Sequence, residues 1–97
     1  KDIFVNVNSQ AFQELLEEGI SEYLVYFFSD RNNSPYTGNV YDYIQVSPIP
    51  LPEHDAIFTE NGVVFMYSQG EISANYLGRI PVIISYDKIK PFLVIPE

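Results

Sequence analysis

The feature that most constrains the fold is an apolar run that directly follows a tight-turn signal. Residues 63–66 (Val-Val-Phe-Met) are apolar in succession and come after Asn61-Gly62. Asn-Gly is the strongest short-range signal for a β-hairpin, because both residue types tolerate positive φ. A strand without polar alternation is typical of a central position with both faces covered. We therefore predict a hairpin with strands at 57–59 and 63–67, the second of them central in a sheet.

A further strand is predicted at 80–86, where alternate apolar residues share one face. Pro81 has no N–H to donate to a ladder, so this strand lies at a sheet edge or carries a bulge there. Residues 68–78 form an irregular crossing, and Asp87 is expected to cap a final turn at 87–92.

One long amphipathic helix is predicted at 10–28, because apolar side chains recur at steps of three and four. Ser9 is a suitable N-cap. Gly19 costs roughly 1 kcal/mol relative to Ala and marks a point at which the helix could divide. The apolar stripe is interpreted as a core face packed on a sheet, and the remaining positions, Gln13 among them, as the solvated face.

The other segments give weaker patterns. Alternation predicts short strands at 2–7 and 39–46, and residues 29–38 are rich in turn formers. Three prolines at alternate positions hold the segment 47–55 extended. Tyr36, Tyr41 and Tyr43 lie in the long connection 29–55, where they form either a stacking or sugar-binding platform or a lid over the core.

Composition limits the classes of partner. Thirteen acidic against five basic residues give a net charge of −8, which argues against nucleic acid and disfavours anionic membranes. Solubility explains this charge more simply than a site for a cationic partner does. No apolar run approaches the roughly 18 residues needed to span a bilayer. The chain begins at Lys1 without Met or a signal peptide, so we expect a single domain, 1–97, from a larger protein.

No catalytic signature is visible, so we predict no enzyme, no cofactor and no metal site. His54 is the only histidine, and with its neighbours Glu53 and Asp55 it cannot surround a metal ion. The only candidate acid pair for glycoside hydrolysis is Asp42 with Glu71.

The stretch 56–93 resembles a bacterial extracytoplasmic family, the C-terminal domain of RsiV-type anti-sigma factors and PdaC-type peptidoglycan deacetylases. The resemblance rests on the hairpin 57–65, on Glu71-Ile72 followed by Gly78, and on the segment 84–91. The chain departs from the family pattern at three positions: Gly70 replaces the usual aromatic residue, and Ala74 and Ser85 replace common prolines.

The resemblance implies an α+β domain of unknown function outside a bacterial membrane, in an envelope lipoprotein anchored through a missing N-terminal part. It implies no activity of its own; in the RsiV-like setting the domain takes part in recognising lysozyme. The position marked by the family is Glu71, with Tyr67 and Tyr76 nearby. Alternatively, Glu71 is a buried carboxylate that bonds backbone groups in the irregular crossing.

We therefore expect an antiparallel sheet of three to five strands with one long helix on a face. The favoured function is binding of a cell-wall component, such as a peptidoglycan glycan, or of a cationic protein. The predicted binding residues are Glu71, Tyr67, Tyr76, Tyr41 and Tyr43. The alternatives are a structural domain that forms a homodimer through a sheet edge, and a hydrolase that uses Asp42 and Glu71.

Overall fold

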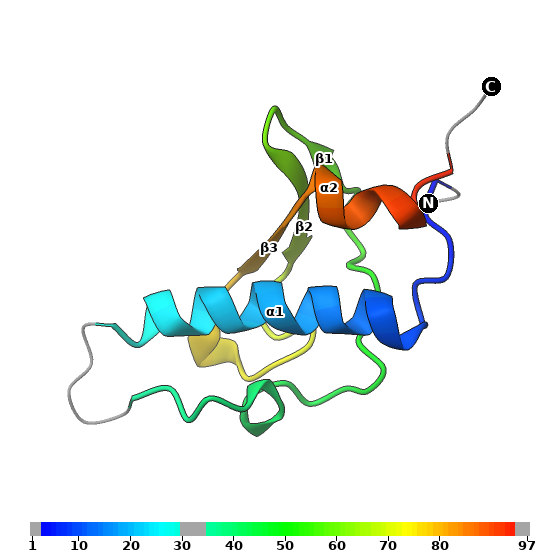
Figure 1. Ribbon diagram of the computed structural model, residues 1–97. Helices are drawn as coiled ribbons and strands as arrows, with labels where there is room; N and C mark the ends of the chain where they lie inside the picture. The colour runs from blue at the N-terminus through cyan, green and yellow to red at the C-terminus, as the bar shows by residue number, and fades with distance from the viewer. Residues whose placement is uncertain (1–2, 30–34, 95–97) are drawn as a thin grey trace.

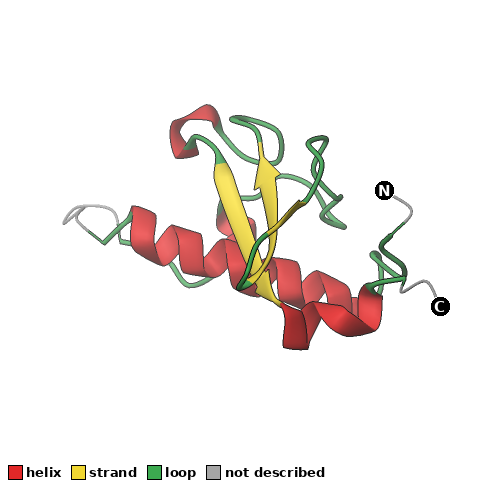
Figure 2. Cartoon of the chain, turned by 90° about the horizontal axis from the view of Figure 1, so that it is seen from above, coloured by secondary structure: helices red, strands yellow, loops and turns green. Residues whose placement is uncertain are grey.

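The computed structural model describes residues 3–29 and 35–94 and shows a three-stranded antiparallel sheet with a long helix packed on one face (Figure 1). The strands are β1 (Ile57–Phe58), β2 (Gly62–Tyr67) and β3 (Ile80–Ser85), in the order β1-β2-β3. The helices are α1 (Gln10–Phe27) and α2 (Tyr86–Ile89), and short 3₁₀ turns lie at Val40–Asp42, Asn75–Leu77 and Lys90–Phe92. Figure 2 shows the strands crossing over α1 at a steep angle. The predicted α+β class is confirmed.

The predicted hairpin is present, and β2 is its central strand, paired with β1 on one side and β3 on the other. Its turn differs from the prediction, because Asn61 does not adopt positive φ and Gly62 is already the first residue of β2. A Cβ atom on Gly62 would meet the carbonyl oxygen of Ile84. This glycine is therefore required for the close approach of two strands.

Only one face of β2 is fully covered. Val63, Phe65 and Tyr67 are buried against the core, whereas Val64 and Met66 are half-buried on the other face. The prediction of burial on both faces was wrong, because no layer of the described residues packs over that second face.

β3 is an edge strand in the described part of the sheet, as Pro81 predicted. It ends one residue earlier than predicted, because Tyr86 begins α2. Ser85, and not Asp87, occupies the N-cap position of that helix.

Helix α1 begins as predicted, with the Oγ of Ser9 accepting a hydrogen bond of 3.2 Å from the Phe12 N–H. It is not divided at Gly19, contrary to the expectation. A Cβ atom at Gly19 would come within 2.5 Å of Cγ1 of Val82, so the glycine lets α1 lie directly against β3. The core lies between α1 and the sheet, and its fully buried aliphatic side chains include Leu16, Ile20, Leu24, Val63, Ile80 and Val82.

The two weak strand predictions, 2–7 and 39–46, were wrong; residue 2 lies outside the described residues. The first segment makes an isolated bridge between Phe4 and Leu93, and the left-handed φ of 57° at Asn6 ends the extended run. In the second segment the side chain of Asn39 accepts a hydrogen bond from the Tyr41 N–H and starts a 3₁₀ turn. Local side-chain bonds of this kind compete with strand pairing.

Gln13 is buried, although its place in the sequence predicted a solvated position. Its Nε2 donates to the carbonyl oxygen of Ile49 at 2.9 Å, and its Oε1 accepts from the Ile49 N–H at 2.8 Å. Ile49 lies between Pro48 and Pro50, which have no N–H groups. The Gln13 amide thus pairs with this extended segment as a neighbouring strand would.

Candidate functional site

Glu71 holds two chain segments together. One carboxylate oxygen accepts from the Ser68 N–H at 2.8 Å and the other from the Glu53 N–H at 2.9 Å. The Glu71 N–H also donates to the Ser68 carbonyl oxygen at 2.9 Å. The carboxylate therefore joins the loop after β2 to the proline-containing segment. Its bonds to backbone groups agree with the expected alternative, but Glu71 is half-buried and not buried as that alternative assumed.

Tyr67 lies beside Glu71 and is fully buried. Its hydroxyl donates a hydrogen bond of 2.6 Å to the carbonyl oxygen of Pro50. Burial, and to a lesser degree the negative charge of Glu71, raise the pKa of Tyr67 above its usual value of about 10. In this structure Tyr67 has no exposed surface with which to touch a ligand.

The other three predicted binding residues lie away from this pair. Tyr76 is 62% exposed and lies beside Phe27, with ring centroids 6.3 Å apart. Tyr43 is half-buried between Phe28 and Tyr36, whose ring centroids lie 5.3 and 5.6 Å from its own. Tyr43 thus packs over the end of α1 as part of a lid. Of the five predicted residues, only Tyr41 lines one of the three pockets described below.

Tyr41 lies at an acidic groove between α1 and the segment 36–41. Its hydroxyl donates to a carboxylate oxygen of Glu17 at 2.7 Å. Partial burial and this hydrogen bond raise the pKa of Tyr41. The groove has a volume of about 350 Å³ and is lined by Glu14, Glu17, Glu18, Ser21, Tyr36, Gly38, Asn39, Val40 and Tyr41.

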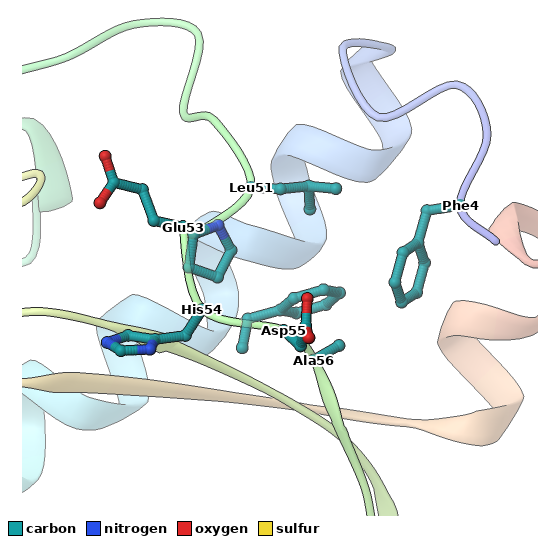
Figure 3. Close-up of a pocket in the computed structure, with 8 residues that line it drawn as sticks. Phe4, Leu51, Glu53, His54, Asp55 and Ala56 are labelled. Carbon is teal, nitrogen blue, oxygen red and sulfur yellow. The ribbon is translucent and has the colours of Figure 1, made fainter. Parts of the chain in front are cut away.

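A larger pocket, of about 470 Å³, lies between the N-terminal segment, the segment 51–56 and β2 (Figure 3). It is lined by Phe4, Leu51, Pro52, Glu53, His54, Asp55, Ala56 and Phe65. This pocket could not be recognised from the sequence, because no local pattern relates residue 4 to residues 51–56 or to residue 65. The only available signal was the apolar character of Phe4 and Leu51 beside an extended segment.

The candidate acid pair for hydrolysis is not assembled around a common cavity. Asp42 accepts a hydrogen bond from the Thr37 hydroxyl at 2.5 Å, while both oxygens of Glu71 are occupied by backbone N–H groups. Neither residue lines the acidic groove, the larger pocket or a third pocket of about 270 Å³ between α1 and β3. Within the described ranges, no three histidine or carboxylate side chains are grouped to hold a metal ion.

The fold is similar to the crystal structure of a member of the DUF3298 family from Bacteroides fragilis, with a TM-score of 0.59 and 17% sequence identity. The match covers 97% of this chain and 34% of that chain, so this chain spans about a third of the solved protein's length. At this identity the likeness concerns the fold alone. No protein-family model and no curated protein matches the chain. None of the helices described is long and apolar enough to cross a membrane.

Proposed function

We propose that this chain is a non-catalytic binding or sensing domain of a bacterial envelope protein, and that its ligand is a cationic protein. The observation that carries the proposal is the acidic groove. Three glutamates of α1 line it together with Tyr41, and no Lys or Arg is among its lining residues. A groove of this composition favours a positively charged partner and disfavours a polyanion.

The charge of the whole domain supports the same partner. The full sequence carries 13 Asp and Glu but only five Lys and Arg, a net charge of −8, and the described residues include three of these five bases, Arg79, Lys88 and Lys90. One of the three, Lys88, forms a salt bridge of 3.1 Å with Glu18; both side chains are about half exposed, so this pair neutralises the groove only weakly. The negative field increases the rate at which a basic protein encounters the domain.

The envelope location rests on the sequence resemblance, and the structural likeness supports only the fold. The sequence resembles the extracytoplasmic domain of RsiV-type and PdaC-type proteins, and the fold is similar to that of a DUF3298 member. A lysozyme-like basic protein, or a cell-wall component, is the ligand class that the sequence resemblance suggests. Because fold alone does not determine function, the binding partner must be tested directly.

The test is biolayer interferometry of the immobilised domain against lysozyme and against soluble peptidoglycan fragments, at low and at physiological salt. We expect saturable lysozyme binding that persists at physiological salt. The double variant Glu14→Gln, Glu17→Gln should weaken it about tenfold, which corresponds to about 1.4 kcal/mol.

The matched control is Glu60→Gln with Asp87→Asn, which removes the same charge from exposed positions outside the groove. We expect less than a twofold effect from it. Equal losses in the two double variants would show that only the net charge acts. If the domain binds the peptidoglycan fragments but does not bind lysozyme, the ligand is the glycan and the proposal of a cationic protein is wrong.

A second candidate, an assembly domain without a ligand, is favoured by the outer face of the sheet. This face carries Ile57, Val64, Met66, Pro81 and Ile83, of which Ile57 and Ile83 are 51% and 56% exposed. Light scattering at high concentration tests it: a dimer that Ile83→Lys dissociates would support assembly, and a monomer at all concentrations would contradict it.

A further inference from the structure

The pocket beside the segment 51–56 has an apolar floor. Phe65 is buried and its ring centroid lies 5.2 Å from that of Phe4, and the half-buried Leu51 and Ala56 complete the apolar wall. Phe58 extends this surface toward β1, because its ring stacks on Phe4 at 6.2 Å and is 49% exposed. A cavity of about 470 Å³ with such a floor is within the size range of ligand-binding sites.

The polar side chains at the rim of this pocket differ in whether they already have a hydrogen-bond partner. His54 lies 3.0 Å from the Ser68 hydroxyl through Nε2. Figure 3 shows the His54 ring and the Glu53 carboxylate directed away from Phe4, with the Asp55 carboxylate between them and Phe4. Within the described part of the chain, Asp55 makes no hydrogen bond or salt bridge, and no Lys or Arg lines the pocket.

An apolar floor beside a carboxylate without a partner favours one class of ligand. An anion would be repelled by the two carboxylates of the rim. A neutral apolar ligand would pack on the Phe rings but would leave the exposed Asp55 carboxylate without a partner. A ligand with an apolar stem and one positive end satisfies both parts of the pocket, because the stem packs on the Phe rings and the charge pairs with Asp55.

We propose that this pocket binds an organic cation with an apolar stem, supplied by a lysine or arginine side chain of a protein partner. The stem lies against Phe4 and Phe65, and the ammonium or guanidinium group lies beside Asp55. The protein source of the cation rests on the proposed function above, while the ligand class rests on the pocket itself. The site is separate from the acidic groove, with which it shares no lining residue.

The first experiment uses the side-chain analogues n-butylamine and n-butylguanidine, with n-butanol and butyrate as neutral and anionic analogues of similar size. Binding to the ¹⁵N-labelled domain is followed by amide chemical shifts. We expect both cations to give saturable shifts confined to residues 51–56 and their neighbours, and butyrate to give none. Asp55→Asn should weaken cation binding about fivefold, and Glu60→Gln, which removes an equal charge elsewhere, less than twofold.

Absence of cation binding at this pocket would overturn the proposal, and so would equal effects of Asp55→Asn and Glu60→Gln. The second experiment repeats the lysozyme measurement with the same two variants. A loss of at least fivefold with Asp55→Asn alone supports a protein side chain as the occupant, and unchanged lysozyme binding excludes it. If lysozyme does not bind the wild-type domain, the protein source and the proposed function fail together, while the analogue titration still decides the ligand class.

Discussion

At the scale of single residues, three side chains replace the backbone partners that the segment 49–53 lacks. Its prolines remove N–H groups, so it cannot form a regular ladder. Gln13 pairs with both polar backbone groups of Ile49, Tyr67 donates to the carbonyl oxygen of Pro50, and Glu71 accepts from the Glu53 N–H. These bonds fix the segment that forms one wall of the larger pocket.

Glu71→Gln should therefore destabilise the fold. A glutamine side chain offers one acceptor oxygen, so either the Ser68 or the Glu53 N–H would lose its partner. We expect a loss of about 1–3 kcal/mol in the free energy of unfolding, measured by urea denaturation. Glu60→Gln should change it by less than about 0.5 kcal/mol.

The same variant separates the two roles considered for Glu71. Unchanged stability together with lost lysozyme binding would show that Glu71 contacts the ligand. Reduced stability, with binding intact at a temperature where the variant stays folded, would show a structural role only.

Tyr67 makes the free energy of unfolding decrease at alkaline pH. Because its pKa is raised in the folded state, the folded protein retains this proton above pH 10 while the unfolded chain loses it. Stability from this group is therefore complete below pH 10 and decreases as pH rises beyond it, by up to about 1.4 kcal/mol per pH unit.

Tyr67→Phe isolates this effect in urea denaturation between pH 7 and 11. At pH 7 the variant should be about 1 kcal/mol less stable, because it lacks the hydrogen bond to Pro50. That difference should shrink or vanish at pH 11. A constant difference across the range would contradict the raised pKa.

At the scale of elements, the close contact between α1 and β3 reverses the usual effect of replacing a helical glycine. Replacing a helical glycine by alanine normally stabilises by about 1 kcal/mol. At Gly19 the added methyl group would overlap the buried Val82 side chain, so we expect Gly19→Ala to destabilise by about 1–3 kcal/mol in thermal or urea unfolding.

Val82→Ala provides the control, since it removes the Cγ1 atom that the new methyl group would meet. In that background Gly19→Ala should be neutral or stabilising, and the two changes should be strongly coupled in a double-mutant cycle. Additive effects would show that the helix moves away from the strand instead.

The elements that could be predicted are those specified by local pattern. The helix α1 follows from its apolar period and from Ser9, and the hairpin follows from the turn signal before β2. The weak strands could not be predicted correctly, because the left-handed conformation of Asn6 and the hydrogen bond of the Asn39 side chain to the Tyr41 N–H end the extended backbone. Neither candidate site could be recognised as a unit, because each combines segments that only the folded chain brings together, such as Glu17 with Tyr41 or Phe4 with Asp55.

At the scale of the whole molecule, the acidic groove and the apolar outer face of the sheet are built from different residues. The glutamates of α1 are on the solvated side of the helix that covers one face of the sheet, whereas the opposite face of β2 and β3 carries Val64, Met66 and Ile83 without a charged residue between them. The acidic groove suits a basic partner. The uncharged face of the sheet suits contact with another protein chain. The proposed cationic partner and the proposed assembly therefore use different surfaces of the domain.

The excess of negative charge predicts that salt stabilises the fold. The Debye length is about 30 Å at 0.01 M and about 10 Å at 0.1 M, and the shorter dimensions of the molecule are 26 and 22 Å. At the lower ionic strength, repulsion among the acidic side chains therefore acts across both shorter dimensions of the domain, and added salt screens it. We expect the Tm to rise by several degrees between about 10 and 300 mM NaCl, equivalent to about 1 kcal/mol for a domain of this size.

Glu22→Gln with Glu60→Gln removes two exposed charges and should flatten this dependence of the Tm on salt. A Tm that falls with salt would contradict this prediction, because attractive pairs would then outweigh the repulsion. The pair of Lys88 with Glu18 is half exposed and contributes at most about 1 kcal/mol.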